Sequence, residues 1–260
     1  MDDTRQILHL TDCHLLADRE GKLHGWSVAA AFECVLAHAL DRYPETDAIV
    51  LGGDLVDDES DAGYHWLNDV LATTARPVLA IAGNHDDPQA MARRLDSAVV
   101  HDQLCLGGWR LIGLCSHRPG HEDGLIGSAA LHDLEARLAA DRSPTLVCVH
   151  HPPFAVGSAW IDAMGLNDGP ALRAVLARHA HVRGVLAGHV HQASQHRLEH
   201  SLGWTTPATM RQFLPGSPDF AEDPTRPPGY RWLALEADGR ITTTVHRCPM
   251  VQGPERRGTD

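Results

Sequence analysis

The sequence predicts an α/β protein, because short apolar runs alternate with amphipathic segments along most of the chain. Between residues 6 and 191, most of the expected strands are followed by a segment with apolar residues at helical spacing. A second observation is that five of the apolar runs end in Asp, Asn or His. Open α/β sheets present such side chains at the carboxyl ends of their strands, where these sheets keep their binding sites.

The first part of the chain is expected to form three strands, at residues 6–11, 49–51 and 78–82. Each is followed by a predicted helix, at residues 28–42, 64–73 and 88–95. Ser27 is a candidate N-cap for the first helix, because its hydroxyl can accept a hydrogen bond from a free backbone N–H group. Pro88 suits the first turn of the third helix, where its missing N–H group is not needed.

Further strands are predicted at residues 109–115, 145–150 and 182–191, and further helices at residues 128–140 and 169–179. From Gln195 the pattern changes to short alternating strands, and residues 231–236 and 241–246 are expected to pair through a turn at residues 237–240. We expect this part of the chain to form a second, antiparallel-leaning sheet stacked on the first. Residues 211–229 are rich in Pro and Gly and are expected to form a long loop.

The 260 residues are enough for one large α/β domain, which we expect to span residues 1–248. Residues 249–260 are expected to be a disordered tail. The formal charge is −12 and no basic stripe is present, so binding along a nucleic acid backbone is disfavoured. No apolar run approaches the roughly 18 residues that a membrane span requires. Six cysteines without a Cys-x-x-Cys pair favour reduced thiols in a cytoplasmic protein.

The polar side chains at the five strand ends form a candidate metal-binding set. They are Asp12 with His14, Asp54, Asn84 with His85 and Asp86, His150 with His151, and His189 with His191. Residues two apart on an extended chain point to the same side, so Asp12 and His14 can share one site, as can His189 and His191. Oxygen and imidazole ligands together suit Mn, Fe, Zn or Co better than calcium.

Asp54 stands in the middle of this set, because a carboxylate with two oxygens can bridge two metals. Seven ligands with one bridge fit two divalent or mixed-valence transition metals with four protein ligands each. Two such cations that share Asp54 and a hydroxide would form a clamp for in-line displacement at phosphorus. The excess of positive charge at this clamp favours a phosphate anion.

Five motifs, in this order along the chain, resemble the motif set of the calcineurin-like metallophosphoesterases. They are Asp12-Cys-His14, Gly53-Asp54, Gly83-Asn84-His85-Asp86, His150-His-Pro152 and Gly188-His189-Val-His191. Residues 206–209, 229–232 and 238–247 further resemble the bacterial class III 3',5'-cyclic AMP phosphodiesterases (CpdA type). The resemblance covers residues 5–247 and implies a four-layer α/β/β/α sandwich with two sheets at its centre.

The resemblance also implies roles for the polar set. One metal would be held by Asp12, His14, Asp54 and His191, and the other by Asp54, Asn84, His150 and His189. The His-x-Pro spacing selects His150 rather than His151 as the ligand. The catalytic residues implied are His85, Asn84 and Asp54, and those that would touch the substrate phosphate are His14, Asp54, Asn84, His85 and His191. His85 is implied to hydrogen-bond a phosphoryl oxygen or to protonate the departing ribose 3'-oxygen.

The activity implied is hydrolysis of 3',5'-cyclic AMP to 5'-AMP, by attack of a metal hydroxide on phosphorus in line with the 3'-oxygen. One alternative substrate is another small phosphodiester or pyrophosphate, such as a glycerophosphodiester or a nucleotide-lipid. A non-catalytic scaffold of the same fold is a further alternative, which the retention of all seven ligands and His85 disfavours. The sequence leaves open the native metal pair, the choice between cyclic AMP and cyclic GMP, and whether the chain is a monomer or a dimer.

Several residues near the motifs have no assigned role. Cys13 is expected to be a buried spectator, whereas Asp86 and His151 are candidates for hydrogen bonds around the ligands. The acidic loop at residues 57–61 is expected to be a solvated face. Four aromatic residues lie near loops that could meet the base of a nucleotide, and none of them is assigned to it: Trp26, Trp160, Trp204 and Phe213.

Overall fold

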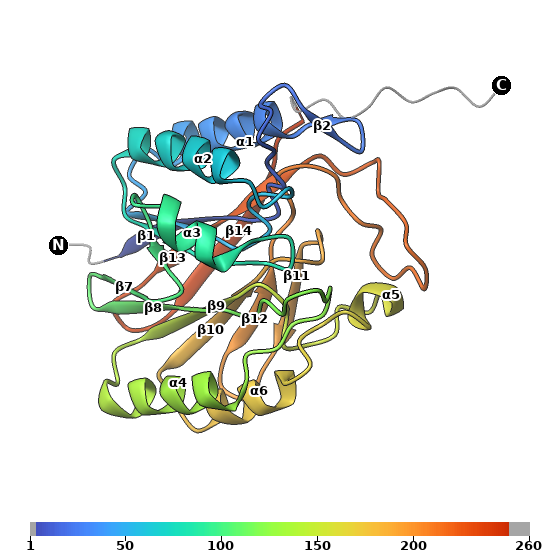
Figure 1. The fold of residues 1–260 in the computed structure, drawn as a ribbon. Coiled ribbons are helices and arrows are strands. Elements are labelled where there is room, and N and C mark those ends of the chain that lie inside the picture. The colour runs from blue at the N-terminus through green and yellow to red at the C-terminus, as the bar shows by residue number, and fades with distance from the viewer. Residues whose placement is uncertain (1–3, 250–260) are drawn as a thin grey trace.

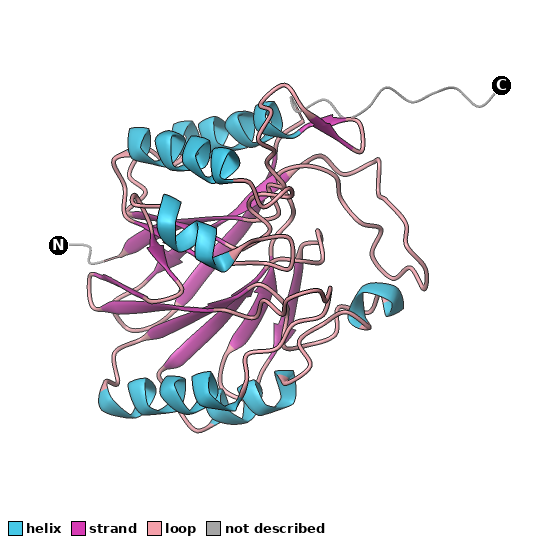
Figure 2. Cartoon of the chain, in the orientation of Figure 1, coloured by secondary structure: helices cyan, strands magenta, loops and turns pink. Residues whose placement is uncertain are grey.

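The computed structural model describes residues 4–249, which contain two six-stranded β-sheets packed face to face. Helices cover the outer face of each sheet (Figure 1), and Figure 2 shows the same four layers by type of element. The helices over the first sheet are α1 (Val28–Arg42), α2 (Asp61–Thr74) and α3 (Pro88–Arg94), and those over the second are α4 (Ser128–Ala140) and α6 (Gly169–Ala177). The predicted α/β/β/α sandwich is confirmed.

The first sheet has the strand order β14-β13-β1-β4-β5-β6. Its strands are β1 (Arg5–Leu10), β4 (Ala48–Leu51), β5 (Val78–Ala80), β6 (Val99–Val100), β13 (Gly229–Leu235) and β14 (Ile241–Arg247). Strands β1, β4, β5 and β6 are parallel to one another, whereas β13 and β14 run antiparallel to their neighbours. The carboxyl ends of β1, β4 and β5 therefore lie at one edge of this sheet.

The second sheet has the strand order β11-β12-β10-β9-β8-β7. Its strands are β7 (Gln103–Leu106), β8 (Trp109–Leu114), β9 (Thr145–Val149), β10 (Val182–Ala187), β11 (Ser194–Arg197) and β12 (Leu202–Thr205). Strands β8, β9, β10 and β12 are parallel, and the edge strands β7 and β11 are antiparallel to them. Two short strands, β2 (Lys22–Leu23) and β3 (Trp26–Ser27), pair separately before α1.

The prediction that the chain from Gln195 onward builds the second sheet is correct for β11 and β12 and wrong for β13 and β14. Strands β13 and β14 form the expected hairpin, but β13 pairs with β1 in the first sheet, where Leu235 lies opposite Arg5. The second sheet is instead centred on β8, β9 and β10, with β11 and β12 at one side. An alternating pattern indicates that a strand has two different faces, and it does not identify the strand with which it pairs.

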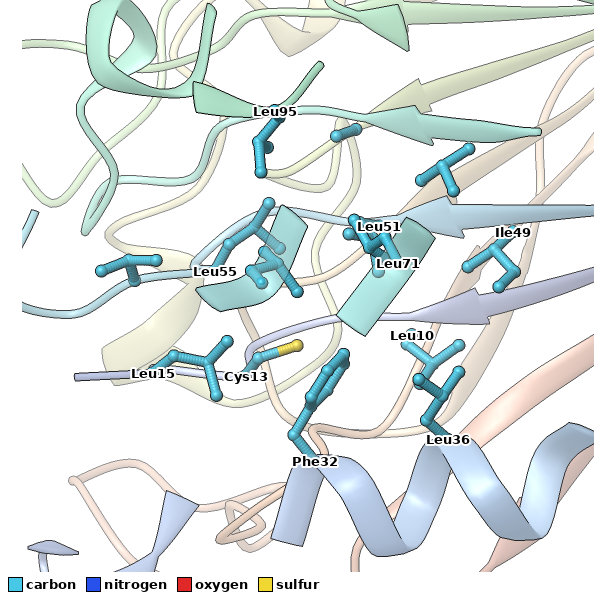
Figure 3. Packing of buried hydrophobic residues seen from close by; sticks show 14 of the residues in the cluster. Leu10, Cys13, Leu15, Phe32, Leu36, Ile49, Leu51, Leu55, Leu71 and Leu95 are labelled. Carbon is cyan, nitrogen blue, oxygen red and sulfur yellow. The ribbon is translucent and has the colours of Figure 1, made fainter. Parts of the chain in front are cut away.

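Buried apolar side chains fill the three spaces between the four layers. In β1, Leu8 and Leu10 pack toward the helices of the first sheet, while Ile7 packs between the two sheets. This division follows from the strand geometry, because successive side chains point to opposite faces. Figure 3 shows the helix side of this packing, where Phe32 and Leu36 of α1 lie close to Leu10. Leu134, Leu172 and their neighbours fill the third space, under α4 and α6.

Two helix starts differ in detail from the prediction. Helix α2 begins at Asp61 rather than near Tyr64, because the Ser60 hydroxyl accepts a hydrogen bond from the Gly63 backbone N–H at 3.1 Å. Ser27 occupies the N-cap position of α1, as expected, but its side chain makes no capping hydrogen bond. The predicted helix at 169–179 ends two residues early, at Ala177.

The long loop predicted at residues 211–229 is confirmed, since residues 206–228 are all described and form no helix or named strand. This loop runs beside the short helix α5 (Ala159–Asp162) at the end of the sandwich to which β1, β9 and β10 point (Figure 1). Residues 250–260 of the predicted tail lie outside the described residues. Across residues 4–249, every helix is too short or too polar to cross a membrane.

Candidate metal centre and active site

The candidate ligands gather where both sheets present the carboxyl ends of their central strands. Asp12, Asp54 and Asn84 follow β1, β4 and β5 of the first sheet, while His150 and His189 follow β9 and β10 of the second. Backbone hydrogen bonds hold these loops against one another. The N–H groups of Asp12 and His14 donate to the carbonyls of Gly53 and Asp54, both at 2.9 Å, and that of Gly188 donates to His150 at 3.0 Å.

The backbone at this edge is turned rather than extended. Five of the seven candidate ligands have a positive φ: Asp12 (55°), His14 (48°), Asp54 (50°), His189 (67°) and His191 (47°). The left-handed region is unfavourable for residues with a side chain, and such strain is concentrated at functional sites. The expectation that each pair shares a side through extended geometry is therefore wrong, although the members of each pair do reach one site.

Two glycines make room for the ligands. A Cβ atom on Gly83 would overlap the Asp54 carboxylate, and a Cβ atom on Gly53 would overlap the ring of His150. Gly53 also has φ of 97°, a conformation that side chains disfavour. The Gly-Asp and Gly-Asn motifs are thus explained by close approach of backbone to ligand side chains.

One group of ligand atoms is formed by Asp12, His14 and His191, all of which are buried. The Nε2 atoms of His14 and His191 lie 3.3 Å apart, and the Nε2 atom of His191 lies 3.3 Å from Asp12 Oδ1. Asp54 Oδ2 lies 3.7 Å from His14 Nε2. Imidazole nitrogens and carboxylate oxygens at such separations can converge on one transition metal ion.

A second group of ligand atoms lies on the other side of Asp54. The same Asp54 Oδ2 atom is 3.3 Å from His150 Nε2, and Asp12, Asp54 and His150 together form a buried group of possible ligands. The His189 ring lies next to this group, with its centroid 5.3 Å from that of His150, and its Nδ1 atom donates to Asn84 Oδ1 at 3.0 Å. The Asp54 carboxylate thus lies near ring nitrogens of both groups, and Asp12 is a member of both.

The side chains fit a metal centre, because buried ring nitrogens are left without protein partners. The Nε2 atoms of His150 and His189 are buried and make no hydrogen bond. The other ring nitrogen of His150 donates to the Gly52 carbonyl at 2.7 Å, which leaves Nε2 facing Asp54 as the nitrogen available to a metal ion. His191 is held in the same way by the Arg211 carbonyl at 3.0 Å. Such hydrogen bonds fix the tautomer of metal-binding histidines.

The electrostatics of the site keep its carboxylates ionised. Burial disfavours the ionised form of Asp54, but the rings of His150, His14 and His85 outweigh it and hold the pKa of Asp54 well below its usual range. Burial also favours neutral His150, yet Asp54 and Asp12 raise the pKa of His150 to about 9. Burial and the neighbouring rings of His151 and His150 lower the pKa of His189, so that ring is neutral. The same carboxylates that attract protons to His150 would attract metal cations.

His85 lies at the mouth of the site and does not belong to either ligand group. Its backbone N–H donates to Asp54 Oδ1 at 2.9 Å, and its Nδ1 atom lies 3.2 Å from Asp57 Oδ1. The hydrogen bond to Asp57 raises the pKa of His85 to about 9, against the opposing effect of burial. The side chain is 38% exposed, so the ring can meet a substrate while its Nδ1 atom stays beside Asp57.

Asp57 is a site residue that the sequence interpretation assigned to a solvated face, and for this residue that interpretation is wrong. Its Oδ1 atom accepts a hydrogen bond from His14 Nδ1 at 2.8 Å as well as facing His85, and only 20% of the side chain is exposed. Asp58 and Glu59 are exposed, as predicted, and the Asp58 carboxylate accepts hydrogen bonds from the backbone N–H groups of Ser60 at 3.2 Å and of Ala17, in the loop after β1, at 2.8 Å. The feature of the sequence that could have indicated Asp57 as a site residue is its position three residues after Asp54.

Glu122 is a second residue that the motifs did not indicate. Its carboxylate accepts a hydrogen bond from Asn84 Nδ2 at 2.8 Å and lies 3.9 Å from His85 Nε2, while 65% of the side chain is exposed. It comes from the loop between β8 and α4, far from any of the five motifs in sequence. Nothing in the local pattern marks it as part of the site.

The open roles of three residues are resolved by their contacts. Asp86 is buried and touches neither His85 nor a ligand ring through its carboxylate. It accepts instead from the backbone N–H groups of Leu55, Val56 and Gly83 and from the Tyr64 hydroxyl. His151 hydrogen-bonds Ser116 Oγ at 2.8 Å and the Glu122 carbonyl at 3.1 Å. Cys13 is fully buried in the core under α1, as predicted (Figure 3).

A cavity of about 140 Å³ opens beside His85. Its polar wall comprises His14, Asp54, Asn84, His85, Glu122, His189, His191 and Arg211, and its apolar wall Trp160, Ile161, Met164, Phe213 and Phe220. Of the four aromatic residues noted in the sequence, Trp160 and Phe213 line this cavity. Trp204 lies instead between the two sheets, and Trp26 packs with Val28 and Met210.

Comparison with known sequences gives consistent matches along nearly the whole chain. The sequence profile of calcineurin-like phosphoesterases matches residues 5–193. A probable cyclic nucleotide phosphodiesterase from Synechococcus is 37% identical over 249 residues, which are 94% of this chain and 92% of that protein. The 3',5'-cyclic adenosine monophosphate phosphodiesterases CpdA of Vibrio vulnificus and Escherichia coli K12 are 36% and 35% identical, and the matches cover 95% and 93% of this chain and 91% and 89% of theirs.

Solved structures with a similar fold are more distant in sequence. A dimetal phosphatase from Danio rerio superposes with a TM-score of 0.67 at 17% identity, covering 94% of this chain and 99% of its own. A purple acid phosphatase from yellow lupin gives a TM-score of 0.65 at 13% identity, covering 97% of this chain and 53% of its own. At these identities the likeness concerns the fold.

Proposed function

The chain belongs to the calcineurin-like phosphoesterase family, and on that premise we propose that it hydrolyses 3',5'-cyclic AMP to 5'-AMP. The observation that carries the proposal is the position of Asp54 between two buried groups of ligand atoms, beside a cavity that His85 faces. The names of relatives that match over more than nine-tenths of the chain support the cyclic nucleotide as the substrate. The family, the fold and the class of enzyme that the resemblance implies are confirmed.

We propose that two transition metal ions, of the Mn, Fe, Zn or Co type, occupy the two ligand groups. Asp12, His14, Asp54 and His191 would hold one, and Asp54, Asn84, His150 and His189 the other. When bound, such a pair polarises phosphoryl oxygens and lowers the pKa of water enough to supply a nucleophile at neutral pH. The unpartnered Nε2 atoms of His150 and His189 support this assignment.

The remaining chemistry is assigned to the protein's own residues. His85, held by Asp57 and carrying a proton, is placed to donate it to the 3'-oxygen of the ribose as the P–O bond breaks. The Asn84 amide stands beside it and would orient a phosphoryl oxygen. Asp57 positions both His85 and His14 through one carboxylate oxygen, so that the proton donor and one ligand are fixed together.

The proposal is tested by kcat/KM for 3',5'-cyclic AMP beside that for a generic aryl phosphodiester, using manganese-loaded protein. The cyclic nucleotide has a far poorer leaving group, so a kcat/KM equal to or above that of the aryl ester requires recognition of the nucleotide. If only the aryl ester is hydrolysed, the natural substrate is another phosphodiester or pyrophosphate. The same assay with cyclic GMP ranks the two purine nucleotides.

Replacing His85 with Ala is expected to lower kcat/KM for the hydrolysed diester by about a hundredfold, because a general acid contributes about that much. Metal content should stay at the wild-type value, since the ring belongs to neither ligand group. Turnover and metal analysis on the same preparation check both points. His65→Ala, an exposed histidine on α2 whose side chain is 70% exposed, is the matched control. Wild-type turnover by the His85 variant would refute the assigned role.

Replacing Glu122 with Gln is expected to strengthen inhibition by inorganic phosphate by about two- to fivefold. The Glu122 carboxylate next to Asn84 and His85 repels anions, and the side chain is exposed, so the effect of removing the charge is modest. A phosphate dianion should gain more than a monoanionic diester. Glu199→Gln, an exposed glutamate between β11 and β12, is the control of equal charge. An unchanged inhibition constant would show that the carboxylate does not act on bound anions.

We also propose a cytoplasmic location. All six cysteines are free, which suits a reducing compartment.

A further inference from the structure

Three aromatic rings form the outer wall of the cavity beside the metal centre. Trp160 comes from α5, while Phe213 and Phe220 come from the long loop before β13. The ring centroids lie 5.0 Å apart for Trp160 and Phe213, 5.1 Å for Trp160 and Phe220, and 5.5 Å for Phe213 and Phe220, with the planes of each pair steeply inclined. These rings belong to none of the buried apolar clusters of the sandwich.

The outermost of the rings is left in contact with solvent. Phe220 is 55% exposed, more than the other exposed large apolar residues of the described chain, Leu125 and Leu214, at 42% each. A Phe side chain buries a large apolar area when it is covered, so leaving it open at a cavity mouth sacrifices that stabilisation. An exposed aromatic surface next to a binding site is a surface that a ligand can cover.

The loop that carries these rings is fixed to the metal centre. Phe213 stacks on the His191 ring at a centroid distance of 4.2 Å and an angle of 9°. The backbone of Phe213 also forms an isolated antiparallel β-bridge with that of Glu222 across the loop. The Leu214 N–H donates to the Ala221 carbonyl at 2.8 Å. These contacts hold Phe220 at a fixed distance from the ligand group of His191, so the aromatic surface is preorganised.

Two donors at the aromatic wall have no partner. The indole N–H of Trp160 and the Nε atom of Arg211 are buried without a hydrogen bond among the described residues. The Arg211 guanidinium lies 5.3 Å from the Phe213 centroid and 5.7 Å from that of Phe220. A purine ring offers flat apolar faces for the rings and ring nitrogens that accept hydrogen bonds, whereas an acyl chain offers neither.

We propose that Trp160, Phe213 and Phe220 form the purine-binding platform of this site, on which the base stacks while the phosphate lies against His85 and Asn84. This inference rests on the proposed function, because it assumes that the substrate is a nucleotide. The arrangement of the cavity agrees with it. His85 and Asn84 line the same cavity as the three rings, so a phosphate and a base can lie within one space.

The platform is tested by equilibrium binding to metal-loaded protein, with 5'-AMP and ribose 5-phosphate as probes. The two differ by the base alone, so the ratio of their dissociation constants reports the contribution of the base. We expect 5'-AMP to bind at least about tenfold more tightly than ribose 5-phosphate, because stacking of a base on an aromatic side chain contributes on that order. Calorimetry supplies the dissociation constants without any turnover.

Variants of Phe220 separate stacking from general apolar contact. Phe220→Tyr should keep the ratio, whereas Phe220→Ala and Phe220→Leu should each lower it about tenfold. The affinity for ribose 5-phosphate should not fall in any of them. Leu214→Ala, at an exposed residue of the same loop that does not line the cavity, is the control and should keep the wild-type ratio.

The outcomes separate the platform from the activity. Equal affinities of the wild-type protein for the two probes, or an unchanged ratio in Phe220→Ala, would overturn the platform even if cyclic AMP is hydrolysed. A high ratio that falls in Phe220→Ala would support the platform, and failure to hydrolyse cyclic AMP would then count against the proposed reaction alone. The ratio of the two dissociation constants could also change only because the chain self-associates as its concentration rises. That result would assign Phe220 to a contact between copies and overturn the platform.

Discussion

Asp54→Asn is expected to lower phosphodiesterase activity by at least about a thousandfold and to reduce the metal content of the protein. Asp54 Oδ2 lies 3.3 Å from His150 Nε2 and 3.7 Å from His14 Nε2, so one oxygen serves both ligand groups. An amide of the same shape carries no charge, and its oxygen is a weaker metal ligand than a carboxylate oxygen. It cannot neutralise and join two cations, and an effect confined to hydrogen bonds around the ligands would be only about 10- to 100-fold.

The measurement combines kcat/KM with metal analysis after dialysis against limiting manganese. Asp69→Asn, an exposed carboxylate on α2, is the control because it removes the same charge away from the site. We expect fewer than two metal ions per chain in Asp54→Asn, with far-ultraviolet circular dichroism unchanged. Two tightly bound ions together with activity within tenfold of wild type would mean that Asp54 does not bridge the metals.

The candidate site could be predicted from the sequence because its chemistry is carried by residue types with few structural alternatives. Asp12, Asp54 and His150 at strand ends serve no purpose in packing, and the five motifs together, in order along the chain, indicated a metal site. The fold followed from the strand and helix periodicities. Which sheet each strand joins did not follow, because the pairing of β13 with β1 depends on contacts 220 or more residues apart in the chain.

The residues that the sequence did not indicate reach the site through loops. Asp57, Glu122 and Phe220 lie in segments whose local composition is that of an ordinary polar or Pro-rich loop. A loop's path is set by the hydrogen bonds and contacts of the whole chain, for instance the bridge between Phe213 and Glu222. For that reason the candidate ligands could be proposed from the sequence, whereas the positions of Asp57, Glu122 and Phe220 beside them required the structure.

Asp86→Ala is expected to lower the free energy of unfolding by about 3–5 kcal/mol, the range for disruption of a buried charged network. The Asp86 carboxylate is fully buried and accepts hydrogen bonds from Leu55 N–H at 3.0 Å, Val56 N–H at 3.1 Å, Gly83 N–H at 2.8 Å and the Tyr64 hydroxyl at 2.8 Å. Removing it leaves several buried donors unsatisfied, each at a cost of about 1–3 kcal/mol. It also releases the loop that holds Asp54, so metal affinity should fall as well.

Urea unfolding in the presence of a chelator measures this loss without the added stabilisation that bound metal provides. Burial raises the pKa of Asp86, so part of the gain from its hydrogen bonds is offset by the cost of burying the charge. Asp86→Asn, which keeps one acceptor and no charge, should therefore lose only about 1–2 kcal/mol, as should Tyr64→Phe, which removes one donor. If Asp86→Ala lowers the free energy of unfolding no more than Tyr64→Phe does, the three backbone donors find other partners. The carboxylate then does not organise the Asp54 loop. A loss several times larger would establish that a carboxylate outside the metal centre fixes the geometry of its central ligand.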